Sequence, residues 1–103
     1  MNPDYLRAIP ESWQNLSKVF TALGDTHRQR ILLTFERNER LNVSQIVSVS
    51  TLSRPTVSHH LKILREAGIL ESEKIGKEVF FWVNKTYLQD VFERILRHIE
   101  NTL

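Results

Sequence analysis

Apolar residues recur every three or four positions in five stretches of the chain, and residues 69–84 break that spacing and read as extended. The first pattern predicts amphipathic helices and the second predicts strands. Residues 1–10 contain Pro3 and Pro10 and are expected to form a short arm. The helices are expected from residue 10 or 11 to 23, from 25 or 26 to 37, from 42 to 50, from 53 to 68 and from 86 to about 101.

The clearest helix is the one at residues 53–68. Ser53 suits the N-cap, Pro55 suits the first turn, where its missing N–H costs nothing, and Gly68 is a natural C-terminal stop. Its buried arc consists of Val57, Leu61, Leu64 and Gly68, with Ala67 and His60 on one shoulder. Its exposed side is rich in hydrogen-bond donors, which suits an acidic surface, although an ordinary polar surface helix has the same pattern.

The neighbours of this helix decide between these two interpretations. Residues 42–50 form a short helix capped by Asn42, and a tight turn with Leu52 as its pin leads into residues 53–68, which is a helix-turn-helix arrangement. Residues 69–75 and 78–84 then flank Gly76 and Lys77, a two-residue turn typical of a β-hairpin. We therefore expect a mainly α fold with a small β-hairpin: a winged helix-turn-helix of five helices plus a two-stranded wing.

Length and composition narrow the function. The 103 residues are expected to form a single domain, residues 1–103. The net charge is only +2, but residues 53–67 alone hold three basic and one acidic residue, so the excess lies on one helix. The absence of cysteine excludes disulfides and thiolate metal sites. No apolar run is long enough for a membrane span and no signal-peptide pattern is present, so we expect a soluble cytoplasmic protein.

The last helix has apolar residues over about half of its circumference, wider than the stripe that one core requires. Either this helix is deeply buried in its own subunit, or it pairs with the same helix of a second subunit in a two-fold homodimer. A 103-residue domain offers little room for the first arrangement, so the dimer is favoured. We expect the interface to comprise Trp13, Leu16, Phe20, Leu88, Val91, Phe92, Ile95 and Ile99.

The order of these elements resembles the ArsR/SmtB family of small winged-helix repressors, over about residues 20–99. The most specific match is RPTVSHHLKILREAGIL at residues 54–70, which is similar to the family's recognition-helix signature; LGDTHRQRIL at 23–32 resembles LADPTRLRIL, with Thr26 and His27 in place of Pro-Thr. The resemblance implies a homodimer that represses transcription from a palindromic, often autoregulatory, double-stranded DNA operator. It implies that Ser53, Arg54, Thr56, Ser58 and His59 read DNA, with Lys62 on the same face, and that Lys74 and Lys77 of a wing at about 74–78 contact the backbone.

Many members of this family release DNA on binding a metal, but the ligands of their usual sites are missing here. The terminal-helix site would fall on Lys85, Tyr87, His98 and Asn101, of which only His98 is a good ligand. Transition metals need three or four converging ligands, so we expect no metal and no cofactor. His27 has no evident partner.

The second helix is expected to bury Ile31, Leu32 and Phe35 and to expose Arg28, Arg30 and Arg37.

Two other function classes are weaker. A winged helix used for protein contact is the main alternative, because a fold does not determine a function. An enzyme is disfavoured because no phosphate-binding glycine loop or nucleophile motif occurs, and Glu71 and Glu73 suit the solvated face of a strand. An effector, either a small molecule or a sequestering protein, is left open.

Overall fold

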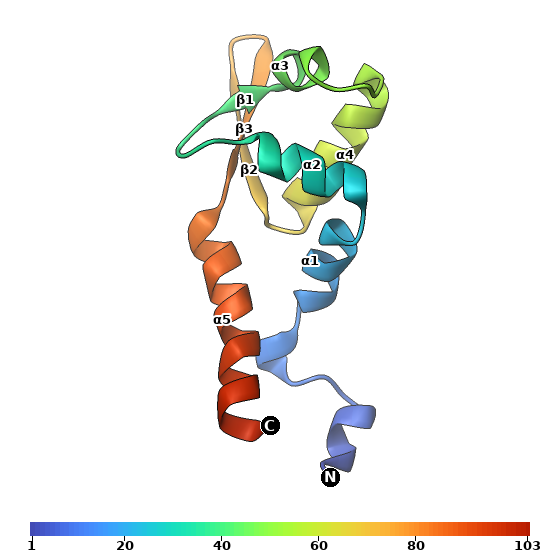
Figure 1. Cartoon of the computed structure of the whole chain (residues 1–103), viewed down its shortest axis with the longest axis vertical. Helices are drawn as coiled ribbons and strands as arrows, with labels where there is room; N and C mark the ends of the chain where they lie inside the picture. The colour runs from blue at the N-terminus through green and yellow to red at the C-terminus, as the bar shows by residue number, and fades with distance from the viewer.

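The computed structural model describes all 103 residues (Figure 1) and has a helix-turn-helix followed by an antiparallel hairpin. This arrangement confirms the predicted mainly α winged fold with five helices. The elements are the 3-10 turns Pro3–Leu6 and Glu11–Trp13, α1 Leu16–Leu23, α2 Thr26–Thr34, β1 Leu41–Asn42, α3 Val43–Ser48, α4 Arg54–Glu66, β2 Leu70–Ile75, β3 Glu78–Val83 and α5 Lys85–Thr102.

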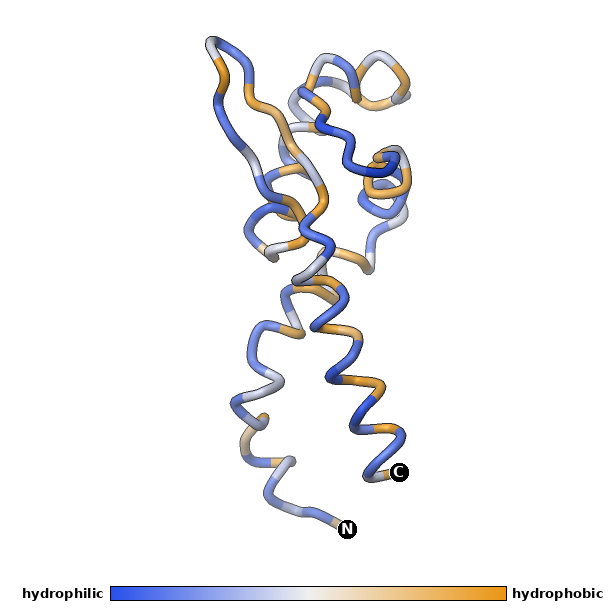
Figure 2. The backbone as a smooth tube through the Cα atoms, turned by 90° about the vertical axis from the view of Figure 1, so that its left-hand side faces the viewer, coloured by the Kyte–Doolittle hydropathy of each residue, from blue (hydrophilic) through white to orange (hydrophobic).

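The elements form a head and a stalk (Figure 1). The head holds α2, α3, α4 and the sheet, and α5 runs away from it beside α1 and the N-terminal arm, so that both termini lie at the far end. The molecule measures 51 × 24 × 21 Å. Figure 2 shows the arm and α5 diverging below the head, with hydrophobic positions recurring along α5. The core continues from the head into the stalk, because Leu16 and Val19 of α1 and Val91 of α5 belong to it.

A single apolar core lies in the head and reaches the upper part of the stalk. Val57, Leu61 and Leu64 of α4 have no exposed surface, and Ile69 directly after the helix is equally buried. Leu16, Val19, Ala22, Ile31, Ile46, Ala67, Leu70, Phe81 and Val91 complete the cluster. The predicted buried arc of residues 53–68 therefore lies in this core, where α1, α2, α3 and β2 contact α4.

Local signals in the sequence determine where the helices begin. Each of α2, α3, α4 and α5 has an N-cap side chain that accepts a backbone N–H of its first turn, which satisfies donors that have no partner inside the helix. In α3 the bond is reciprocal, because the Gln45 side chain also accepts the Asn42 N–H. The four caps are Asp25, Asn42, Ser53 and Asn84.

Gly68 joins α4 to the sheet under two constraints. Its φ of +84° is a left-handed conformation that L side chains rarely adopt. A Cβ at this position would also lie 2.7 Å from Cε2 of the Tyr87 ring. The predicted helix stop is confirmed, and the close approach of α5 is a further reason for glycine.

The first helix begins later than its apolar pattern predicts, at Leu16 instead of Pro10 or Glu11. Asn15 has a left-handed backbone (φ 75°) and separates α1 from the 3-10 turn at residues 11–13. Contacts with α5 hold that turn: Arg94 donates to the Ser12 carbonyl over 2.9 Å, and the Trp13 ring meets the His98 ring edge-on at 5.3 Å. Tertiary contacts here override a helical pattern.

The wing has three strands instead of the two predicted. The sheet order is β1-β3-β2, because Leu41 pairs with Phe81 and Asn42 with Phe80, both antiparallel. A two-residue strand is too short to show a periodic pattern in the sequence. Residues 41 and 42 form a strand because β3 passes beside them and pairs with them. The hairpin itself is as predicted, with Gly76 at φ +64° in the turn.

Candidate nucleic-acid interface

The N-terminal half of α4 presents an uninterrupted polar surface. The residues predicted to read DNA are all exposed: Ser53, Arg54, Thr56, Ser58, His59 and Lys62. The Ser53 hydroxyl caps the helix and lies 2.9 Å from the Thr56 hydroxyl, so these two side chains are already oriented. Lys62 lies 3.9 Å from Glu66, a pair so exposed that it adds little stability and leaves the amine available.

Arg54 is tied to the preceding helix. Its guanidinium donates to the Ser44 hydroxyl over 2.8 Å, which links the start of α4 to the first turn of α3. The pairing across ten residues was not predicted, although the Asn42 cap of α3 could have placed Ser44 in the first turn. An Arg held in this way has fewer rotamers to lose when it contacts a base edge or phosphate.

Ser44 and Arg54 also meet the wing. With Lys77 they line a small cavity of about 150 Å³, next to Glu78, which accepts a hydrogen bond from the Asn42 amide over 3.2 Å. Two cations, one carboxylate and a hydroxyl thus surround a space open to solvent. The structure brings Lys77 close to the recognition helix, whereas Lys74 lies further back on β2 as an exposed residue.

One face of the wing is braced by contacts that the sequence did not reveal. Arg40 lies 4.0 Å from the Trp82 ring centroid and 3.1 Å from the Glu73 carboxylate. The Trp82 indole N–H donates to Glu71 over 2.9 Å. Glu71 and Glu73 are therefore exposed residues that hold the sheet in place, in agreement with their predicted position on the solvated face.

Behind α4, Arg28 points inward, contrary to the prediction that it lies outside. Its guanidinium donates to the carbonyl of Ala22 (2.8 Å) and of Thr21 (3.1 Å), and its Nη1 lies 3.2 Å from His60 Nδ1. Arginine has no acceptor atom, so His60 Nδ1 must be the acceptor, which puts the ring proton on Nε2. Helical period alone predicts Arg28 on the outside, because the period does not show that the carbonyls of Thr21 and Ala22 at the end of α1 lie within reach of its guanidinium.

His60 is the buried histidine of this region, with 8% of its surface exposed, and it has charged and titratable neighbours. The His27 ring lies 5.9 Å away and the His59 ring 6.1 Å away, so His27 has a partner that the sequence did not show. Burial lowers the pKa of His60, and the nearby charge of Asp25 opposes that shift. Hydrogen bonds from backbone N–H groups, that of Arg28 first, lower the pKa of the Asp25 carboxyl.

We expect His60 to make the protein less stable in mild acid. An unfolded histidine takes up a proton near its ordinary pKa of about 6.5, whereas folded His60 resists that proton because of its lowered pKa. The free energy of unfolding should therefore fall as pH drops below about 6.5, and it should fall more steeply in the wild type than in His60→Gln. Urea unfolding at a series of pH values measures this, with His98→Gln as control; equal pH slopes for wild type and His60→Gln would contradict it.

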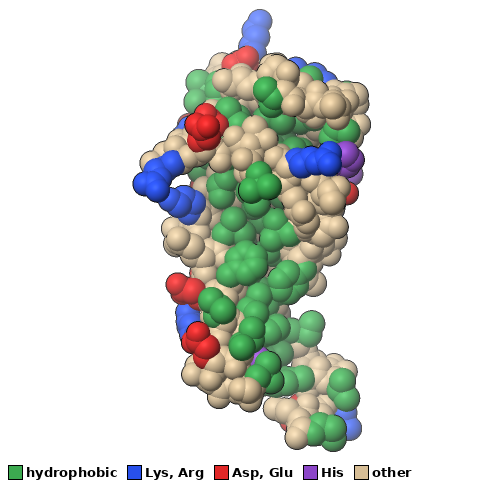
Figure 3. Space-filling view, viewed as in Figure 1, with side chains coloured by type: hydrophobic (Ala, Val, Ile, Leu, Met, Phe, Trp, Pro, Cys, Tyr) green, Lys and Arg blue, Asp and Glu red, His purple; other side chains and the backbone are tan.

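The stalk exposes a broad apolar surface (Figure 3), where hydrophobic side chains run along α5 and α1. Phe20, Phe92, Leu96 and Ile99 are 46%, 43%, 53% and 48% exposed. Among the residues expected at a dimer interface, Leu16 and Val91 are already covered by their own protomer, and Trp13, Leu88 and Ile95 are partly buried against the core. Leu96 was not among the expected residues, although its place on the same stripe of α5 could have indicated it.

No group of three or more His, Cys, Asp or Glu side chains is arranged so that it could hold a metal ion. The His98 ring packs on Trp13, and Lys85, Tyr87 and Asn101 bring no carboxylate or imidazole to it. Separately, none of the helices combines the length and the apolar character required to cross a bilayer.

Comparisons with known proteins agree with this geometry. Residues 25–72, from the cap of α2 into β2, match the model of the bacterial regulatory protein, arsR family. The chain is 30% identical over 84 residues to the transcriptional repressor SdpR of Bacillus subtilis, covering 82% of this chain and 92% of that protein. It is 29% identical over 85 residues to an uncharacterised HTH-type transcriptional regulator of Methanocaldococcus jannaschii, with coverages of 82% and 96%. An ArsR-like transcriptional regulator from Rhodococcus sp. RHA1 superimposes with a TM-score of 0.75 at 28% identity, covering 84% of this chain and 80% of that one.

Proposed function

The chain belongs to the ArsR family of bacterial DNA-binding transcriptional repressors, and from this premise we propose that it acts as a single-domain homodimer on a palindromic operator. In this proposal α4 enters the major groove and the wing lies along the phosphate backbone. Family members are transcriptional regulators, so the chain is not an enzyme. Its place of action is the cytoplasm, where the chromosome lies, and a promoter of its own operon is the first target to test.

The observation that carries the DNA-binding part is the surface of α4. Six exposed polar or basic residues occupy its first three turns, and no acidic residue occurs before Glu66. Arginine and hydroxyl side chains at the start of a recognition helix suit contacts with base edges and nearby phosphates. A surface used to bind a protein partner would show apolar anchors here, and Pro55 is the only exposed apolar residue in these turns.

The dimer part is supported by the apolar stalk. Two copies of α5 and α1 related by a two-fold axis would cover Phe20, Phe92, Leu96 and Ile99, which are large side chains left about half exposed in one protomer. Such a dimer presents two α4 helices with opposite polarity, which suits two half-sites of inverted sequence. His98, packed on Trp13, is proposed to hold the stalk together and not to bind metal.

The decisive experiment is a nuclease footprint of the protein on the DNA upstream of its own gene. We expect protection of two inverted half-sites about one helical turn apart, 10–10.5 base pairs centre to centre, or a multiple of that distance. Protection of a single half-site would contradict the dimer, and no protection anywhere in the operon would contradict autoregulation. Failure to bind any duplex in a random-sequence selection would instead favour the protein-interaction alternative.

The wing should contribute affinity without sequence preference. Replacing both Lys74 and Lys77, which are exposed at the hairpin, by glutamine removes two phosphate contacts per protomer, and so four per dimer, in this proposal. The slope of log affinity against log salt should then fall in magnitude by about 3 to 4, equally for operator and scrambled DNA. Fluorescence anisotropy over a salt series measures the slope, and Arg97→Gln, an exposed cation on the stalk, should leave it unchanged. An unchanged slope in the double variant would mean that Lys74 and Lys77 of the wing do not contact the phosphates.

A further inference from the structure

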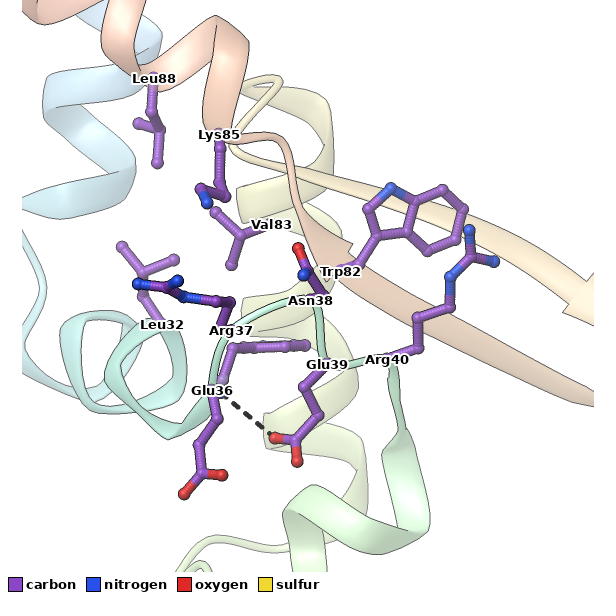
Figure 4. A pocket seen from close by; sticks show the side chains of 11 residues that line it. Leu32, Glu36, Arg37, Asn38, Glu39, Arg40, Trp82, Val83, Lys85 and Leu88 are labelled. Atoms are coloured by element: carbon purple, nitrogen blue, oxygen red, sulfur yellow. Dashed lines mark hydrogen bonds between the residues drawn. The ribbon is translucent and has the colours of Figure 1, made fainter.

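A second cavity lies on the side of the head away from α4, between the α2–β1 loop and the junction of β3 with α5. Its volume is about 460 Å³, within the range of about 300–1,000 Å³ that small-molecule sites occupy. Its apolar wall is formed by Leu32 and Phe35 from the end of α2, Trp82 and Val83 from β3, and Leu88 from α5. Figure 4 shows Leu88 and Lys85 extending from α5 towards Val83, and Leu32 on the opposite wall.

The polar part of the cavity has two unpaired cations. Arg37 and Lys85 line it, and neither belongs to any of the five ion pairs of the protein. Arg40, the third basic residue, is already bound to Glu73 and stacked on Trp82. Figure 4 shows the Arg37 guanidinium beside Leu32 and the Lys85 amine above Val83, so both cations border the apolar wall.

The carboxylates of the lining do not neutralise these cations. Glu39 accepts the backbone N–H of Glu36 over 3.3 Å and so closes the loop at Asn38, which has a left-handed φ of 59°. Glu36 makes no ion pair, and Figure 4 shows its carboxylate at the opposite side of the cavity from Lys85. Lys85 is also the first residue of α5, where the helix dipole adds positive potential.

We propose that this cavity binds a small amphipathic carboxylate, with its apolar body against Leu32, Val83 and Leu88 and its carboxylate between Arg37 and Lys85. Cations beside an apolar wall favour a ligand that carries both characters, because each group is then matched and the charge stays near solvent. A neutral apolar ligand would form no ion pair with Arg37 or Lys85, and an inorganic anion would make no apolar contact with the wall. Such a ligand would touch the loop between α2 and β1, the β3 strand of the wing and the first turn of α5.

The test uses the DNA-free protein, so its outcome does not depend on operator binding. Phenylbutyrate serves as the probe, with phenylbutyramide as its neutral analogue and phenylbutylamine as its cationic one. The chain has two tryptophans, whose indole N–H signals in two-dimensional NMR can be followed separately. We expect phenylbutyrate at up to millimolar concentration to shift the Trp82 signal saturably and to leave the signal of Trp13, which packs on His98 and does not line the cavity, unchanged.

Charge variants then identify the site. Arg37→Gln and Lys85→Gln should each weaken phenylbutyrate binding about tenfold, since each removes one charge-assisted hydrogen bond. Both residues are exposed, so the variants should fold, and Arg97→Gln should bind like the wild type. The proposal is overturned if the Trp82 signal does not move, if phenylbutyramide or phenylbutylamine binds as tightly as phenylbutyrate, or if both charge variants retain wild-type affinity.

Discussion

Leu96→Glu is expected to convert the proposed dimer into monomers. Leu96 is 53% exposed in the protomer and lies on the α5 face shared with Phe92 and Ile99. In a two-fold interface the substitution occurs twice, and it would bury two carboxylates of like charge without partners. We expect dimerisation to weaken by at least about a hundredfold, which at 1.4 kcal/mol per tenfold is a modest estimate for two unpaired charges.

Analytical ultracentrifugation over a range of protein concentrations measures the dimerisation constant. The matched control is Asn101→Glu, which adds the same charge to an exposed position on the far side of α5. Circular dichroism should show that both variants keep their helices, because Leu96 is not part of the buried core. If Leu96→Glu sediments as a dimer like the control, α5 does not form the interface.

Loss of the dimer should also remove most operator affinity. A dimer binds its second half-site at a high effective concentration, whereas a monomer has only one recognition helix. In fluorescence anisotropy, Leu96→Glu is expected to bind the operator little better than scrambled DNA, and Asn101→Glu should retain the preference. Wild-type operator affinity in a monomeric Leu96→Glu protein would contradict the two-half-site proposal.

Arg54→Ala is expected to reduce operator affinity far more than affinity for scrambled DNA. Arg54 lies at the start of α4, and its bond to Ser44 directs its guanidinium across the face between α3 and the wing. A bidentate contact between arginine and guanine contributes about 1–3 kcal/mol of base discrimination. In a dimer two such contacts are lost, so discrimination should fall by about a hundredfold or more.

The matched control is Arg65→Ala, an exposed arginine in the last turn of the same helix. Both variants lose one charge per protomer, so only the position differs. Anisotropy titrations at one fixed salt concentration compare operator and scrambled duplexes, because contacts with phosphate alone weaken both equally. Equal losses on the two duplexes for Arg54→Ala would remove its base-reading role.

Ser44→Ala tests how much the orientation of the Arg54 side chain contributes, separately from the contact that Arg54 makes with DNA. It removes the hydroxyl that accepts from Arg54 over 2.8 Å but leaves the guanidinium in place. We expect a smaller loss of operator preference than in Arg54→Ala, of about thirtyfold, since one net hydrogen bond contributes about 1 kcal/mol and two are lost in the dimer. A loss as large as that of Arg54→Ala would mean that Ser44 itself contacts DNA.

Local chemistry explains why most of the head could be predicted from the sequence. Ser53, Asn42 and Gly68 act through their own backbone or the next turn, so their roles at the ends of α3 and α4 follow from residue type and spacing. The Gly76 turn is equally local. The buried face of α4 follows from helical period alone, since a helix with a single apolar stripe turns that stripe toward the core.

Features that depend on residues distant in the chain could not be predicted in this way. Arg28 turns inward because the α1–α2 junction offers two carbonyls and His60 offers a third acceptor, a meeting of three elements. The helix α1 begins only after Asn15, although its apolar pattern starts earlier, because contacts with α5 hold Ser12 and Trp13 in a separate turn. The strand β1 exists only because β3 passes beside it.

The family, the winged helix-turn-helix and the polar face of α4 could all be inferred from the sequence, because they depend on residue type and spacing over short stretches. Three features became visible only in the folded chain: which apolar residues of the stalk stay exposed, which cation contacts His60, and the position of Arg37 and Lys85 beside an apolar cavity. Exposure, pairing and cavities are properties of side chains brought together from separate elements, and a pattern along one chain does not contain them.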